Sequence, residues 1–189
     1  MLSRSATHPL WLIGLLRIAF FVVLIALCAK IQIPVPGTPV PITLQVLSVL
    51  LAGMILGPIE GGISAAAYLG AIALGLPLDA YNHSAAALLS PTAGFLIGFV
   101  PGAMLAGLSW RVSKYRFFAC LVAGIAGLAA IYGLGVAGLY RLSGLWVTAI
   151  ALGAIPFLLV DAAKVMLASS LVMLGRESWL RWITPGLGR

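Results

Sequence analysis

Apolar stretches of membrane-spanning length constrain this chain more than any other feature of its sequence. Residues 11–33 contain only two charged side chains, Arg17 and Lys30, and similar apolar runs follow as far as residue 174. A helix that crosses a bilayer needs about 20 consecutive, mainly apolar residues. Only 8% of the chain is charged, whereas soluble domains carry about 25% charged residues. The sequence therefore predicts an all-α integral membrane protein, with residues 1–189 as a single transmembrane domain in the lipid bilayer.

Glycine and proline divide the apolar sequence into six predicted transmembrane helices. They occupy residues 11–33, 42–56, 63–76, 91–110, 117–140 and the second half of 145–174. Gly153 and Pro156 split the last run into a short or interfacial segment and the last helix, with Pro156 in its first turn, because proline is tolerated there and not in a helix interior. Residues 57–62 are expected to form a tight turn that leaves Glu60 in solvent. Glycines in the fifth helix predict close helix contacts in lipid.

The distribution of Lys and Arg predicts how these helices are oriented. Six spans place both termini on one side of the membrane, and most of the cations fall on that side: Arg4, Arg17, Arg111, Lys114, Arg116, Arg176, Arg181 and Arg189. Only Lys30 and Arg141 fall on the other side, with Lys164 inside the membrane. Short cytoplasmic loops carry an excess of Lys and Arg, so both termini are predicted to be cytoplasmic. The net charge of +7 is then a topology signal, and nucleic acid is not expected as a partner.

A cleaved signal peptide is the alternative interpretation of the first apolar run, because it has a basic start and small residues around Cys28. The continuation of the run to Ile33, with no polar mature domain after it, argues against a signal peptide.

The sequence lacks the motifs that several classes of catalytic and metal-binding proteins require. No glycine-rich phosphate loop with Lys-Ser/Thr occurs, so the chain is not expected to hydrolyse ATP by that route. The two histidines are far apart, and Cys28 and Cys120 lie in separate apolar runs. A metal site is therefore not expected. An intramembrane enzyme remains a second hypothesis, although no serine nucleophile motif supports it.

Two opposite charges, Asp161 and Lys164, lie inside the last apolar run. Residues three apart share one face of a helix. Each charge near the middle of a bilayer costs about 2.5 to 3.5 kcal/mol on insertion scales, so the pair requires an explanation. It either locks the helices together as a structural ion pair or lines a polar pocket for a small ligand. We favour the pocket.

Three polar features are predicted to face the non-cytoplasmic side, from which a nutrient would arrive. One is the stiff, extended loop after the first helix, which contains Pro34, Pro36, Pro39 and Pro41. The others are the loop of residues 78–90, with Asn82, and the start of the last helix. Gln45 lies in the first turns of the second helix. Plainer interpretations stay open, because Asn82 is typical of turns and Gln45 can satisfy loop backbone.

A set of segments, in order along the chain, resembles the biotin-specific substrate-capture subunits (S components) of energy-coupling-factor (ECF) transporters, the BioY family. The segments are residues 26–34, 39–45, 51–53 with 56–58, 68–69 with 75–77, and 90–99, followed by Pro156, Phe157, Asp161 and Lys164. The chain departs from the family pattern in residues 82–87, where relatives are richer in glycine. It also departs at Ala93 and Phe95, where glycine and tyrosine are expected.

The resemblance implies a six-helix subunit of a bacterial or archaeal cell membrane that binds biotin from outside with high affinity and has no catalytic activity or cofactor of its own. It also implies partners, namely a transmembrane coupling protein (T component) and two cytoplasmic ATPases. The residues that it suggests for binding are Gln45, Asn82, Asp161 and Lys164. The proline loop is expected to act as a lid, and Ala26 and Ala29 are candidates for the face that meets the coupling protein.

Two other hypotheses remain open from the sequence. One is a capture subunit for another vitamin, such as thiamin or riboflavin. The other is a structural membrane protein that binds no ligand.

Overall fold

The computed structural model describes residues 10–111 and 116–175, which form a bundle of helices. Its helices are α1 (Leu10–Lys30), α2 (Gln45–Leu56), α3 (Pro58–Ala73), α4 (Ala93–Gly107), α5 (Arg116–Ser143), α6 (Trp146–Gly153) and α7 (Leu158–Leu174), with the 3₁₀ helices η1 (Ser84–Leu89) and η2 (Leu108–Arg111). Two short strands, β1 (Gln32–Ile33) and β2 (Ile42–Thr43), pair antiparallel with Gln32 opposite Thr43. The predicted all-α membrane fold is confirmed.

The six predicted helices correspond to α1–α5 and α7, but they differ in length. Within the described residues, three helices are long and apolar enough to cross a membrane, and α6 with α7, bent by 51°, makes a fourth if the pair counts as one span. The 12 residues of α2 and the 16 residues of α3 rise about 18 and 24 Å, which is less than the hydrocarbon thickness of about 30 Å. Six full spans are therefore more than helix length alone supports.

The predicted turn at residues 57–62 is shorter in the structure. Gly57 alone makes it, with φ of 87°, a value that favours glycine. Pro58 then begins α3, since proline suits the first turn of a helix. Glu60 consequently lies in the first turn of α3, 4.0 Å from the guanidinium of Arg17 on α1, and not in a solvated loop.

The break before the last helix is present, but it extends further than predicted. α6 ends at Gly153, Pro156 lies in the connecting turn, and α7 begins at Leu158. Asp161 therefore lies in the first turn of α7, with Lys164 one turn later.

Close helix packing depends on glycines at the contacts. A Cβ on Gly53 of α2 would collide with the carbonyl oxygen of Ala103 on α4, and one on Gly98 of α4 would lie 2.8 Å from the Cα of Ile131 on α5. Small residues permit this approach of helices in lipid. Tyr68, Phe99 and Ile131 are among the buried side chains of the core that results.

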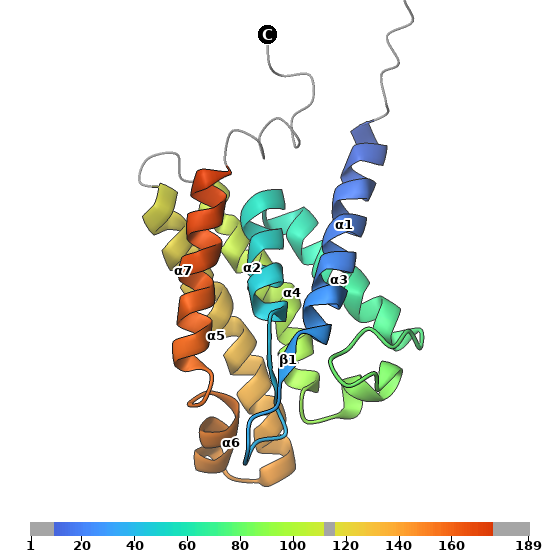
Figure 1. Cartoon of the computed structure of the whole chain (residues 1–189), viewed down its shortest axis with the longest axis vertical. Coiled ribbons are helices and arrows are strands. Elements are labelled where there is room, and N and C mark those ends of the chain that lie inside the picture. The colour runs from blue at the N-terminus through green and yellow to red at the C-terminus, as the bar shows by residue number, and fades with distance from the viewer. Residues whose placement is uncertain (1–9, 112–115, 176–189) are drawn as a thin grey trace, which may run out of the picture.

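The polar loops gather at one end of this bundle. The β1–β2 hairpin and α6 lie at the lower end in Figure 1, whereas α1 begins and α7 ends at the upper end. This arrangement agrees with an even number of crossings. Of the cations used to predict the orientation, Arg4, Lys114, Arg176, Arg181 and Arg189 lie outside the described residues.

Candidate binding site

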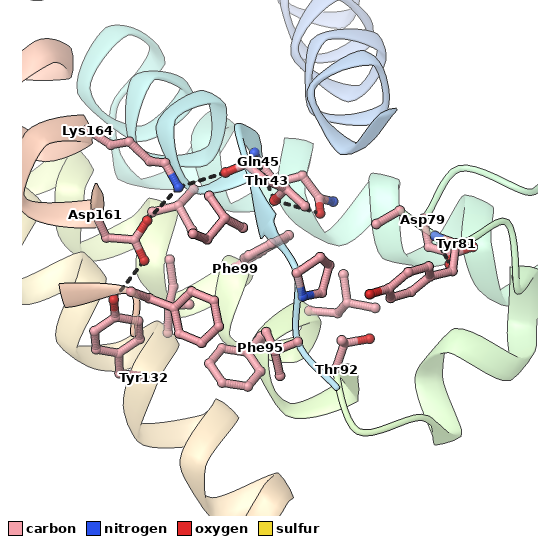
Figure 2. Close-up of a pocket in the computed structure, with 18 residues that line it drawn as sticks. Thr43, Gln45, Asp79, Tyr81, Thr92, Phe95, Phe99, Tyr132, Asp161 and Lys164 are labelled. Carbon is pink, nitrogen blue, oxygen red and sulfur yellow. Dashed lines mark hydrogen bonds and ion pairs between the residues drawn. The ribbon is translucent and has the colours of Figure 1, made fainter. Parts of the chain in front are cut away.

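A small cavity of about 60 Å³ lies where the β1–β2 hairpin and the loop after α3 meet α2, α4, α5 and α7 (Figure 2). Segments that are distant in sequence therefore enclose one site. Gln45, Asp161 and Lys164 are among its lining residues. Asn82 is not, although Asp79 and Tyr81 from the same loop are.

Asp161 and Lys164 form a close ion pair in the wall of the cavity. The ammonium of Lys164 lies 2.6 Å from Oδ1 of Asp161 and donates a second hydrogen bond, of 2.7 Å, to the carbonyl oxygen of Thr43. Both side chains are buried, with 6% of the Asp161 side chain and 8% of the Lys164 side chain exposed. A buried charge is tolerated only when it is paired and hydrogen-bonded, and this pair satisfies both conditions.

Tyr132 of α5 holds the other carboxylate oxygen, since its hydroxyl donates a 2.7 Å hydrogen bond to Oδ2 of Asp161. A carboxylate has about four acceptor positions and an ammonium has three donors. These contacts use one position on each carboxylate oxygen of Asp161 and two donors of Lys164. The pair therefore retains an acceptor and a donor for a ligand in the cavity.

The break between α6 and α7 explains why the sequence places a carboxylate at this depth. Because α7 begins at Leu158, Asp161 lies in its first turn. The start of a helix carries a partial positive charge that favours a nearby anion. The Gly153 and Pro156 break thus places the start of α7 inside the bundle, with Asp161 in its first turn.

Gln45 links the hairpin to α3. Its amide nitrogen donates to the hydroxyl of Tyr68 at 2.8 Å, and its amide oxygen lies 3.3 Å from the hydroxyl of Thr43. Tyr68 in turn donates to the carbonyl oxygen of Leu78 in the loop after α3. Both amide atoms of Gln45 therefore have protein partners, and the side chain fixes the wall of the cavity.

Lys30, the last residue of α1, fixes the loop after α3. Its ammonium donates to the carbonyl oxygens of Pro77 and Asp79 at 2.8 and 2.7 Å, and to Oδ1 of Asn82 at 2.6 Å. All three donors of the ammonium are thereby used. Asn82 belongs to this connection between α1 and the loop, and its backbone has a φ of 60°.

Asp79 holds the same loop from inside. Its carboxylate accepts hydrogen bonds from the backbone N–H groups of Tyr81 and Ser84, at 3.1 and 2.9 Å. The residue is only 4% exposed. This acidic residue therefore shapes the part of the loop that brings Tyr81 to the cavity.

The proline loop covers the cavity with its last residues. Val40 and Pro41 line it, whereas Pro34, Pro36 and Pro39 are exposed and do not. The loop is anchored near its middle, where the hydroxyl of Thr38 donates a 2.7 Å hydrogen bond to the carbonyl oxygen of Leu152 in α6.

Several residues of the site were not predicted. They are Tyr132, the carbonyl of Thr43, and Phe95 and Phe99, the last two of which supply apolar wall from one face of α4. The spacing of four between the two phenylalanines is a helix-face signal. A tyrosine hydroxyl inside an apolar span was also a signal, because buried tyrosines usually find a hydrogen-bond partner.

The candidates for the coupling face lie mostly inside the bundle. Ala29 is fully buried and Ala26 packs partly against the core. The exposed apolar side chains of α1 include Leu15, Leu16 and Leu27. Among the described residues, no group of three His, Cys, Asp or Glu side chains is placed to hold a metal ion.

Comparison with known sequences gives one consistent result. The model of the BioY family matches residues 4–181. The chain is 38% identical over 160 residues to the biotin transporter BioY of Thermotoga maritima, with 84% of this chain and 93% of that protein covered. It is 35% identical over 168 residues to the biotin transporter BioY of Rhizobium etli, with 83% and 87% covered.

A solved structure has the same fold. The crystal structure of the S component for biotin from an ECF-type ABC transporter superposes with a TM-score of 0.82 and 27% sequence identity, over 92% of this chain and 95% of that chain.

Proposed function

The chain belongs to the BioY family, and from this membership we propose that it is the biotin-binding S component of an ECF transporter. Relatives from two bacteria carry the name biotin transporter, and the solved structure is a biotin S component. The protein is a multi-pass membrane protein, and in this proposal it captures biotin at the end of the bundle that holds the cavity.

The observation that carries the proposal is the pairing of Asp161 with Lys164 at an apolar cavity. The ureido ring of biotin has two N–H donors and one carbonyl acceptor. Asp161 can accept from an N–H while Lys164 donates to the carbonyl, which matches the acceptor and donor that the pair retains. Because the pair is neutral overall, it suits an uncharged ring.

The apolar part of the cavity suits the rest of the molecule. Phe95, Phe99 and Ile131 line it and offer contacts to the sulfur-containing ring and the aliphatic chain. Ligand pockets typically measure roughly 300 to 1,000 Å³, and this cavity of about 60 Å³ has to widen to admit biotin. We infer that the proline loop moves as the lid, because in the described structure one hydrogen bond, from Thr38 to Leu152, joins residues 34–41 to another element.

The source of energy follows from what the sequence lacks. Without a phosphate-binding loop of the Walker type in its sequence, the chain would depend on other subunits to couple ATP hydrolysis to transport. We propose a T component and two cytoplasmic ATPases as these subunits, in a bacterial or archaeal cell membrane with both termini cytoplasmic. The role of Ala26 and Ala29 in contacting the T component stays a prediction, and the burial of Ala29 makes it the weaker candidate.

Direct binding measurements test the proposal. The detergent-purified chain is titrated calorimetrically with biotin, thiamin and riboflavin, and with biotin methyl ester, which keeps the ureido ring and loses the carboxylate. We expect one saturable biotin site, retained binding of the ester, and no binding of the other two vitamins. Thiamin is a cation and would meet the ammonium of Lys164. Binding of thiamin or riboflavin in preference to biotin would overturn the proposed specificity, and binding of none would overturn the function.

A further inference from the structure

A second cavity lies on the side of the bundle, between η1, the first turns of α4 and the last turns of α5. We call it the groove. It measures about 450 Å³ and shares no lining residue with the biotin cavity. Its walls are apolar, with Leu89, Ile97, Leu134 and Leu142 all exposed to a large degree. Arg141 is the one charged residue among those that line it.

Arg141 differs from Lys30, the other cation predicted on this side of the membrane. Lys30 donates to three acceptors of the chain. In the described parts of the chain, no hydrogen bond or ion pair reaches the Arg141 side chain. A guanidinium has five donors in a fork that matches carboxylate and phosphate oxygens. The groove therefore presents an unpaired cation beside an apolar surface.

The length of α5 fixes the depth of this groove in the membrane. From Arg116 to Arg141 the helix rises about 37 Å at about 1.5 Å per residue, more than the hydrocarbon thickness of about 30 Å. Arg141 therefore reaches the level of the lipid headgroups. Leu134 lies about 10 Å deeper along the axis, among the acyl chains. The groove therefore presents its cation at the level of the lipid headgroups and its apolar wall at the level of the acyl chains.

We propose that this groove binds one anionic glycerophospholipid, with the phosphate on Arg141 and an acyl chain against Leu134 and Ile97. An arginine can pair with phosphate through two parallel hydrogen bonds. The lining residues include no carboxylate that would hold the ammonium of a zwitterionic headgroup, and Arg141 would repel it. An arginine that only reaches toward water from a helix end would need no adjoining groove. The site is separate from biotin capture.

The test uses the full chain in detergent with two short-chain lipids, dioctanoyl phosphatidylglycerol and dioctanoyl phosphatidylcholine. Thermal unfolding is followed against lipid concentration for the wild type, Arg141→Gln and Ala137→Phe, the last of which fills the groove and keeps the charge. We expect saturable stabilisation by phosphatidylglycerol and a much smaller response to phosphatidylcholine. Arg141→Gln loses a charge-assisted contact, so the phosphatidylglycerol concentration that gives half of the stabilisation should rise about tenfold or more.

A control separates specific binding from general charge effects. Lys30→Gln removes the other cation predicted on this side of the membrane, whose donors are already used, and its lipid-dependent shift should equal that of the wild type. Equal stabilisation by both lipids would overturn the proposal, because it indicates non-specific solvation. So would an undiminished phosphatidylglycerol response in both groove variants. Biotin affinity in Arg141→Gln should be unchanged, so that failure here leaves the proposed function intact.

Discussion

Among the described residues, two ion pairs lie within the helices of this membrane protein, and they differ in distance, burial and position relative to the cavity. Asp161 and Lys164 of α7 are 2.6 Å apart, with side chains 6% and 8% exposed. Arg17 of α1 and Glu60 of α3 are 4.0 Å apart, and 34% of the Glu60 side chain is exposed. The first pair lines the biotin cavity, and neither member of the second does.

The difference lies in the neutral groups around each pair. Tyr132 and the carbonyl of Thr43 fix the first pair by hydrogen bonds from other elements. In the described part of the chain, Oε2 of Glu60 has no hydrogen-bond partner. A pair held by neutral partners keeps one orientation and can present its remaining donors and acceptors to a ligand. A loose pair contributes mainly to the contact between two helices.

The largest expected effect is from Asp161→Asn. The change removes the charge that faces Lys164 and leaves one amide oxygen, in place of two carboxylate oxygens, to accept from Tyr132, Lys164 and the ureido N–H. Hydrogen bonds to charged groups contribute about 1.5 to 3 kcal/mol, so biotin affinity should fall roughly 10- to 100-fold. Isothermal titration calorimetry measures it. The same chemical change in the other pair, Glu60→Gln, is the control, and equal losses in the two variants would contradict the distinction between the pairs.

A smaller loss is expected from Lys30→Met, which keeps the length of the side chain and removes its three donors. The loop of residues 77–82 then loses its hydrogen bonds to Lys30, and Tyr81 is positioned by the Asp79 carboxylate within a less firmly held loop. We expect about a tenfold weaker affinity, together with faster labelling of a cysteine placed at His83 by a membrane-impermeant maleimide. Unchanged labelling and affinity would show that the loop is held in another way. Arg141→Gln controls for loss of charge at this end of the protein.

Tyr132→Phe should have a still smaller effect. The substitution removes only the hydroxyl that donates to Asp161, and the ring keeps its packing. A hydrogen bond from a neutral donor contributes about 0.5 to 1.5 kcal/mol, so biotin affinity should fall roughly two- to tenfold. Tyr140→Phe is the matched control on the same helix, since Tyr140 stacks on Trp146 away from the cavity. A loss in the control as large as in Tyr132→Phe would point to a general effect on α5.

The smallest effect on binding is expected from Glu60→Gln. A partly exposed ion pair contributes about 0 to 1 kcal/mol, so Tm should fall by a few degrees at most, with biotin affinity within about twofold of the wild type. Thermal unfolding and calorimetry of the same sample give both values. A loss of affinity larger than that of Tyr132→Phe would mean that the second pair also acts on the site.

Local sequence features predicted the framework of the site. The apolar runs gave the helices, Gly153 and Pro156 gave the break, and the spacing of Asp161 and Lys164 put both charges on one face. Each of these features depends on residues within a few positions of one another. The predicted extent of the turn, residues 57–62, was wrong, because Pro58 begins a helix where the glycines around it suggested a loop.

The partners of the charges could not be predicted in the same way. Tyr132 is 29 positions from Asp161, and Thr43 is 121 positions from Lys164. Which hydroxyl or carbonyl meets a charge depends on the rotation and depth of each helix, and packing decides these. Asn82 illustrates the point, since its side chain accepts a hydrogen bond from Lys30, 52 positions away, which the sequence of the loop does not reveal.

The amino-acid sequence by itself determined that this protein is a helical membrane protein with an ion pair in its last helix, because hydrophobic periodicity and chain breaks are local properties. Only the tertiary structure decided that Asp161 is held by Tyr132 and that Lys164 is held by the hairpin. It also decided that Lys30 uses all three donors, whereas no hydrogen bond or ion pair reaches the Arg141 side chain within the described residues. These contacts join segments far apart in the chain, and their geometry follows from how tightly the helices pack against one another.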